Sequence, residues 1–241
     1  PLNHDGTTKL PLVMWAYPME FKDQHTAGQS TNGKHDFIYP FWGSPLYWVA
    51  KGYAIMDDVS FPIIGENDTP PNDHFHEQMI TNAEAAIEAA RSLKWIDVNR
   101  IAIGGHSYGA FMVSYLLTHT SLFAAGIARS GAYNRTLTPF GFQSEERNLW
   151  QAKDVYQTMN PFMDADKMKT PLLLIYGKED NNSGTYTIQT ERYYASLKAL
   201  GATVRMVLLP FESHSYQARQ SILHVLWEQD QWLEKDVKNK A

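Results

Sequence analysis

Three residue types in this sequence, a serine, a carboxylate and a histidine, could together cleave an acyl bond. Ser107 is the centre of a Gly-x-Ser-x-Gly sequence at positions 105–109, which an apolar run at 101–103 enters and a helical pattern from 111 leaves. A Gly-x-Ser-x-Gly sequence between a strand and a helix is typical of a nucleophile elbow, in which the serine occupies a strained turn. The flanking Gly105 and Gly109 would let strand and helix approach closely. Ser107 is therefore the candidate nucleophile.

The serine hypothesis requires a base and an acid, because a hydroxyl is a weak nucleophile until a histidine oriented by a carboxylate accepts its proton. In α/β-hydrolases the three residues follow the chain order serine, acid, histidine, each in a loop after a strand. Asp180 follows a predicted strand at 172–176, and His214 follows another at 204–209. Both loops should reach the carboxyl edge of the sheet beside Ser107. We therefore predict Asp180 as the acid and His214 as the base.

Other titratable residues near these motifs have simpler interpretations. Glu179 adjoins Asp180 but should point the other way, and His106 adjoins Ser107 but should face away from the nucleophile. His224 falls in the closing helix, where a structural role is expected. His74 and His76 precede a glutamate, yet no third ligand is placed with them, so a solvated loop is favoured over a metal site. The sequence predicts no metal and no cofactor.

An acyl-transfer site also needs donors for the oxyanion. One is normally the backbone N–H of the residue after the nucleophile, here Tyr108. The second should come from the loop after an early strand, which we place at 15–21. This segment lacks glycine-rich character, but Tyr17 offers a phenolic O–H suited to an oxyanion. The alternative for Tyr17 is an aromatic residue that caps the core at a strand end.

Composition and pattern indicate one α/β domain. The 241 residues are 44% hydrophobic and 20% charged, with a net charge of −5, no cysteine and no basic run. These features exclude a thiol nucleophile and argue against nucleic acid as a partner. No apolar stretch reaches the roughly 18 residues of a membrane span. The chain opens with Pro1 and a turn-like segment, so we expect the natural protein to extend further toward its N-terminus.

Strand-like and helical segments alternate, which predicts a doubly wound, mostly parallel sheet flanked by helices. Strands are expected at 10–17, 53–57, 101–103, 124–127, 172–176 and 204–209, and helices at 81–93, 111–118, 187–200 and 218–233. The segment 129–169 breaks this alternation. A long insertion of this kind is more often a loop-and-helix region over an active site than a piece of core.

Longer motifs resemble the catalytic domain of the prolyl oligopeptidase family, most closely its glutamyl endopeptidase branch. The resemblance lies in residues 104–112, 128–141 and 209–214, with further matches at 62–66 and 180–182. It implies an α/β-hydrolase fold, a triad at Ser107, Asp180 and His214, and an oxyanion tyrosine at Tyr17. Tyr176 departs from the histidine of many relatives.

The resemblance also implies regions that this sequence does not include. Members of the family carry an N-terminal β-propeller and two strands before the one that ends in the oxyanion loop. The 241 residues are therefore expected to be a C-terminal fragment of a longer chain. The predicted strand at 53–57 would then lie at an open sheet edge, which invites pairing with a second copy.

These features predict a serine peptidase that hydrolyses peptide substrates through an acyl-enzyme. An esterase using the same triad is the nearest alternative, and a non-catalytic interaction domain on a hydrolase scaffold is another. The resemblance further suggests cleavage after glutamate, which requires a fixed cation for the acidic side chain.

Three arginines could supply that cation: Arg129, Arg135 and Arg147. We prefer Arg135, which lies in a polar, turn-rich stretch, whereas Arg129 is close to a strand end. The alternative is that Arg135 is a surface residue or pairs internally with Glu145 or Glu146.

Overall fold

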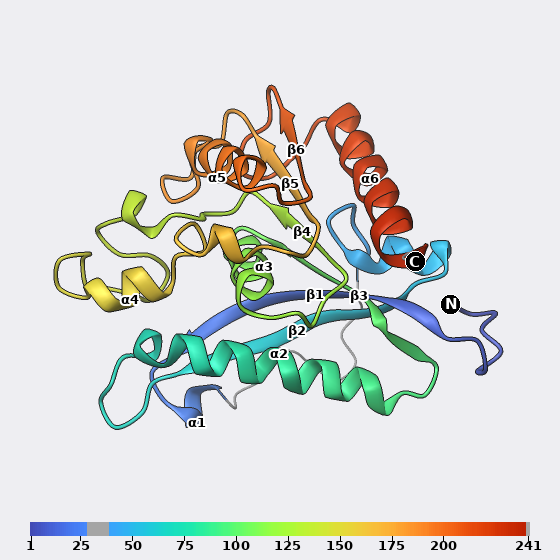
Figure 1. Cartoon of the computed structure of the whole chain (residues 1–241), viewed down its shortest axis with the longest axis horizontal. Helices are drawn as coiled ribbons and strands as arrows, with labels where there is room; N and C mark the ends of the chain where they lie inside the picture. Colours follow the sequence, from blue (N-terminus) through green and yellow to red (C-terminus); the bar gives the residue numbers. More distant parts are fainter. Residues whose placement is uncertain (28–38, 240–241) are drawn as a thin grey trace.

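The computed structural model describes residues 1–27 and 39–239, in which strands and helices alternate along the chain (Figure 1). The strands are β1 (Leu10–Phe21), β2 (Ala54–Ile64), β3 (Ile96–His106), β4 (Ala125–Arg129), β5 (Leu172–Gly177) and β6 (Val204–Leu209). The α-helices are α1 (Gln24–Ala27), α2 (Phe75–Ser92), α3 (Tyr108–His119), α4 (Lys153–Thr158), α5 (Ile188–Ala199) and α6 (Arg219–Leu233). Shorter helical turns are η1 (Pro45–Lys51), η2 (Pro71–His74), η3 (Arg135–Leu137), η4 (Ala165–Lys167) and η5 (Glu234–Lys238).

The strands form one parallel sheet in the order β2-β1-β3-β4-β5-β6. Helices α2, α3 and α5 contribute to a core cluster on one face, and η1 and α6 to a second cluster on the other (Figure 1). Every residue of β4 and β5 is buried, as expected for strands covered on both faces. The predicted doubly wound sheet is confirmed.

The first strand is longer than predicted, which corrects the loop expected at 15–21. That segment is the second half of β1, and it pairs in parallel with β2 from Ala16 opposite Val59 to Phe21 opposite Ile64. Two features explain why the sequence pattern did not predict this pairing. Pro62 lies within β2, which an edge strand tolerates, and the register shifts between Met14 and Ala16.

Two further expectations about the sheet agree with the structure. All but the first residue of the strand expected at 53–57 belong to β2, which stands at the end of the strand order. The irregular segment 129–169 begins with the last residue of β4 and then contains η3, α4, η4 and no strand longer than an isolated bridge. It leaves the carboxyl end of β4, beside the strand that leads into Ser107. None of the described helices is both long and apolar enough to cross a membrane.

Candidate active site

Ser107 occupies a strained turn between β3 and α3. Its backbone has φ 58° and ψ −117°, in a region that residues with a Cβ rarely adopt. The turn is tight enough to require glycine on both sides. A Cβ on Gly105 would lie 2.4 Å from the backbone of Gly109, and a Cβ on Gly109 would lie 2.7 Å from the carbonyl oxygen of Ala16. The sequence therefore forms the predicted elbow, with the serine at its tip.

The structure brings Ser107, His214 and Asp180 into one hydrogen-bonded line. His214 Nε2 lies 2.9 Å from Ser107 Oγ, and His214 Nδ1 lies 2.9 Å from Asp180 Oδ2. Asp180 follows the end of β5 and His214 follows the end of β6, so both reach the carboxyl edge of the sheet where the elbow lies. The arrangement can pass a proton from the serine hydroxyl to the imidazole while the carboxylate orients the ring.

Asp180 is held in its charged form by several donors. Its side chain is fully buried, and burial alone would raise the pKa of the carboxyl group. Hydrogen bonds from His214, the Asn182 amide and the Thr185 hydroxyl outweigh burial and hold the Asp180 pKa below its ordinary value. Thr185 Oγ1 also lies 3.1 Å from His214 Nδ1, so it contacts both partners. A charged carboxylate suits the role of stabilising an imidazolium.

The neighbouring carboxylate and histidines lie outside this line. Glu179 is exposed, and His224 pairs with Glu228 on α6. His106, expected to face away from the nucleophile and to be structural, packs its ring against that of His214 with centroids 4.9 Å apart. Burial lowers the pKa of His106 to about 3, with Arg129 and His214 adding to the shift, so this ring is a neutral packing surface behind His214.

His74 and His76 serve local contacts. His74 pairs with Glu77, and His76 lies 2.7 Å from the hydroxyl of Tyr115. Within residues 1–27 and 39–239, no group of three or more histidine or acidic side chains is placed to hold a metal ion.

Two tyrosines lie beside the elbow. Tyr108 is the first residue of α3, where backbone N–H groups lack an acceptor within the helix. Tyr17 lies within β1 rather than in a loop, and its ring meets that of Tyr108 edge to face at 6.1 Å. Tyr17 is 41% exposed, so it is not the core-capping residue of the alternative interpretation. Burial raises the pKa of Tyr17, with Gln143 opposing the shift, so its hydroxyl keeps the proton it would donate.

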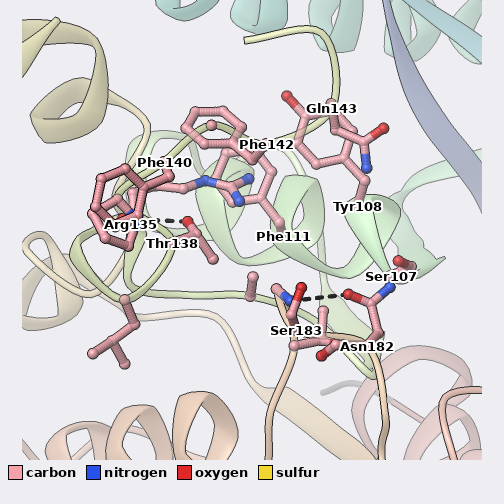
Figure 2. A pocket seen from close by; sticks show the side chains of 16 residues that line it. Ser107, Tyr108, Phe111, Arg135, Thr138, Phe140, Phe142, Gln143, Asn182 and Ser183 are labelled. Carbon is pink, nitrogen blue, oxygen red and sulfur yellow. Dashed lines mark hydrogen bonds between the residues drawn. The ribbon is translucent and has the colours of Figure 1, made fainter. Parts of the chain in front are cut away.

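A pocket of about 410 Å³ opens next to Ser107 and Tyr108 (Figure 2). Its remaining walls come from α3, from the insertion and from the loop after β5, including Phe111, Arg135, Phe140, Phe142, Gln143 and Asn182. The insertion thus covers the site as predicted, and it supplies two of the aromatic residues that line the pocket, Phe140 and Phe142.

Arg135 lies in the pocket wall on η3 and is 2% exposed. Its guanidinium carbon is 4.0 Å from the ring centre of Phe111, 4.1 Å from that of Phe142 and 5.4 Å from that of Tyr108 (Figure 2). Its Nε and Nη2 find no hydrogen-bond partner among the described residues. Burial lowers the pKa of Arg135 to about 10, which still leaves it charged at neutral pH. The aromatic rings thus hold a buried cation that has donors to spare.

The other candidate arginines already have partners. Arg129 is buried with its guanidinium carbon 4.2 Å from the ring centre of Trp15, and it donates to the carbonyl of Gly43. Arg147 binds both Glu145 and Asp73. The partner considered for Arg135 in the alternative interpretation, Glu145, is therefore engaged by Arg147, and Arg135 is not a surface residue.

A sequence model of the prolyl oligopeptidase family matches residues 73–240, which include the elbow, the Asp180 loop and His214. The chain belongs to the prolyl oligopeptidase family. Similarity to curated relatives extends over nearly the whole chain. The chain is 54% identical over 227 residues to the protein named "Probable glutamyl endopeptidase, chloroplastic" in Oryza sativa subsp. japonica. The Arabidopsis thaliana protein of the same name is also 54% identical over 227 residues. Each match covers 94% of this chain and 24% of the relative, so the chain spans about a quarter of their length.

Solved structures of peptidases share the fold. The acylaminoacyl peptidase of Pyrococcus horikoshii superposes with a TM-score of 0.68 at 22% identity, over 96% of this chain and 38% of that one. Dipeptidyl peptidase 4 of Porphyromonas gingivalis gives a TM-score of 0.75 at 19% identity, over 98% and 32%. The predicted α/β-hydrolase fold is therefore confirmed.

Three residues of the site were not predicted from the sequence: Thr185, Phe142 and Glu20. Thr185 donates a hydrogen bond to Asp180, and only its place in the same loop could have indicated this role. Phe142 lies in the irregular insertion, where no periodicity marks an inward-facing side chain. Glu20 accepts hydrogen bonds from Tyr108 and Ser144, but it lies in the half of β1 that the pattern did not identify as a strand.

Proposed function

We propose that this chain is the catalytic domain of a serine peptidase that cleaves peptide bonds after acidic residues, in particular glutamate. The observation that carries the proposal is the hydrogen-bonded line from Ser107 through His214 to Asp180 at a strained elbow. Family membership and the names of the relatives support it.

The proposed reaction passes through an acyl-enzyme. Ser107 Oγ attacks the carbonyl carbon of the scissile bond while His214 Nε2 takes the hydroxyl proton. The Tyr108 N–H and the Tyr17 O–H donate to the oxyanion that forms. The C–N bond then breaks, His214 returns the proton to the leaving amine, and an ester links Ser107 to the acyl group. His214 next deprotonates a water molecule that attacks this ester, and the proton passes back to Ser107 as the acid product leaves.

Asp180 supports both halves of the cycle without changing its own protonation state. Its hydrogen bond to His214 Nδ1 fixes the tautomer in which Nε2 can accept the serine proton. Its negative charge then stabilises the imidazolium.

Arg135 supplies the proposed preference for an acidic side chain. Its buried guanidinium lines the pocket next to Ser107 and has donors without acceptors. A buried charge without a partner is costly, so a carboxylate that enters this pocket regains part of that free energy through its opposite charge. The uncharged amide of a glutaminyl residue would regain less.

Matched glutamyl and glutaminyl peptides test this function. The wild-type protein should cleave the glutamyl peptide with the higher kcat/KM. Arg135→Gln should lower kcat/KM for the glutamyl peptide and spare the glutaminyl peptide. The loss should correspond to a rise of about 1.5–3 kcal/mol in activation free energy, the value of a charge-assisted hydrogen bond. Arg91→Gln, which changes an exposed arginine on α2, serves as the control.

Two outcomes would count against the proposal. Equal losses on both peptides would show that Arg135 does not recognise charge. Rapid hydrolysis of short-chain esters without cleavage of any peptide would favour the esterase alternative.

A further inference from the structure

One carboxylate, Glu20, connects the two sides of the pocket that contains Arg135. Glu20 is half-buried on β1, three residues after Tyr17. One of its oxygens accepts the hydrogen of the Tyr108 hydroxyl. The other accepts two hydrogen bonds from Ser144, from the backbone N–H at 2.9 Å and from Oγ at 2.6 Å. Both oxygens are thus engaged by groups that belong to different segments of the chain.

The segment that Ser144 belongs to forms a wall of the pocket. Residues 139–143 all line it, and the segment has no strand beyond the isolated bridge between Phe142 and Glu145. Its far end is fixed by Arg147, which binds Glu145 and Asp73. Ser144 lies at the exposed tip of this turn, and Glu20 attaches that tip to β1.

The hydrogen bonds of Glu20 also affect the position of Arg135, through two aromatic rings. Phe142, in the turn that Glu20 holds, and Tyr108, whose hydroxyl Glu20 holds, both lie against the guanidinium. A guanidinium packed on ring faces keeps its place only while the rings keep theirs. If the turn moved away from β1, Phe142 would leave Arg135 and the pocket wall would open to water.

We propose that Glu20 is a positioning residue for substrate recognition. It holds the turn at 139–144 against β1 and so keeps Arg135 in place for the substrate carboxylate. This inference rests on the proposed function. Glu20 acts through Tyr108, Ser144 and Phe142 and does not touch Ser107, His214 or Asp180 through any of its hydrogen bonds.

The charge of Glu20 fits this role. Its carboxylate is close enough to favour the charged form of Arg135, yet its oxygens are bound to Tyr108 and Ser144. The guanidinium therefore gains a nearby negative charge while its Nε and Nη2 stay free of partners among the described residues. Glu20 compensates the buried cation without a hydrogen bond to it, because both carboxylate oxygens are bound to Tyr108 and Ser144.

Glu20→Gln tests the proposal in the full-length protein, because an amide keeps the shape of the side chain but has one acceptor oxygen in place of two. Hydrogen exchange at the Ser144 amide should become faster, since that exposed N–H is protected by Glu20. The kcat/KM for glutamyl peptides should fall about tenfold, mainly through KM, with a smaller loss on glutaminyl peptides. Labelling of Ser107 by a small fluorophosphonate should stay within about twofold of wild type, because the triad is unchanged.

Two further variants serve as a weaker change and as a control. Ser144→Ala removes the hydroxyl bond and keeps the backbone bond, so its loss should be smaller than that of Glu20→Gln. Glu146→Gln changes an exposed carboxylate two residues further along the same segment and should behave as wild type.

Other results would contradict either the role of Glu20 or the proposed function. Unchanged exchange at Ser144 in Glu20→Gln would overturn the attachment. Faster exchange with equal losses on glutamyl peptides, glutaminyl peptides and fluorophosphonate labelling would overturn the link to recognition. Failure of the wild-type protein to cleave any peptide would refute the proposed function instead, and the exchange measurement would still decide whether Glu20 holds the turn.

Discussion

At the scale of single residues, the site places one histidine behind another. His214 stands between Ser107 and Asp180, and the ring of His106 packs against it from the elbow. His106 in turn meets the ring of Tyr216, whose hydroxyl bonds to Ser130 and to the carbonyl of Ile175. A neutral ring in this position supports the base without competing for the hydrogen bond to Asp180.

The pKa of His106 predicts an acid-sensitive contribution to stability. Burial lowers this pKa from 6.5 to about 3, so between these values the unfolded chain binds a proton that the folded protein excludes. The free energy of unfolding should therefore fall as the pH falls through this window, by at most about 1.4 kcal/mol per pH unit from this residue. His106→Gln should make the decline less steep, as measured by urea denaturation between pH 6.5 and 4.5. An unchanged slope would show that His106 titrates alike in both states.

At the scale of elements, the positions of the site residues follow from strands that end at one edge of a parallel sheet. The alternation of strands and helices predicted the fold, and the chain order of Ser107, Asp180 and His214, each after an apolar run, predicted the line that they form. The second half of β1 could not be predicted, because its register shift and the proline of its partner strand break the alternation that marks a strand. Periodicity does not mark inward-facing side chains in an irregular insertion either, so the place of Phe142 beside Arg135 could not be predicted.

The extended β1 predicts a test of Tyr17. Its place on a strand beside Tyr108 fixes the direction of its hydroxyl more firmly than a loop would. Tyr17→Phe should lower kcat about 10²-fold with little change in KM, since the donor acts mainly on the transition state. Tyr47→Phe, at a tyrosine exposed to a similar degree, is the control. Normal turnover in Tyr17→Phe would remove this residue from the proposed oxyanion site.

At the scale of the whole molecule, the sheet ends at β2, where no further strand of the described residues pairs, although Gln78 and Asn82 of α2 bind the backbone of its last residues. β2 stands at the end of the strand order and pairs with β1 on one side. Its middle part, including Asp57, Asp58 and Ser60, is exposed. Unpaired backbone groups along an edge strand favour pairing with another chain.

This edge predicts self-association of the 241-residue chain by itself. It should dimerise or aggregate more readily than a form extended at its N-terminus by further strands, which sedimentation velocity at increasing concentration would measure. Ser60→Lys places a charge on the exposed edge and should reduce the association. A monodisperse monomer at high concentration would contradict the expectation.

The central claim, that Ser107 is a nucleophile activated by His214, is tested most directly by locating a covalent adduct. The protein should be incubated with a fluorophosphonate, digested and sequenced by mass spectrometry, alongside Ser107→Ala and His214→Ala. The proposal predicts one adduct, on Ser107, that is absent in Ser107→Ala and formed far more slowly in His214→Ala, with cleavage of glutamyl peptides lost in both. An adduct on another residue, or peptide cleavage that survives Ser107→Ala, would contradict it.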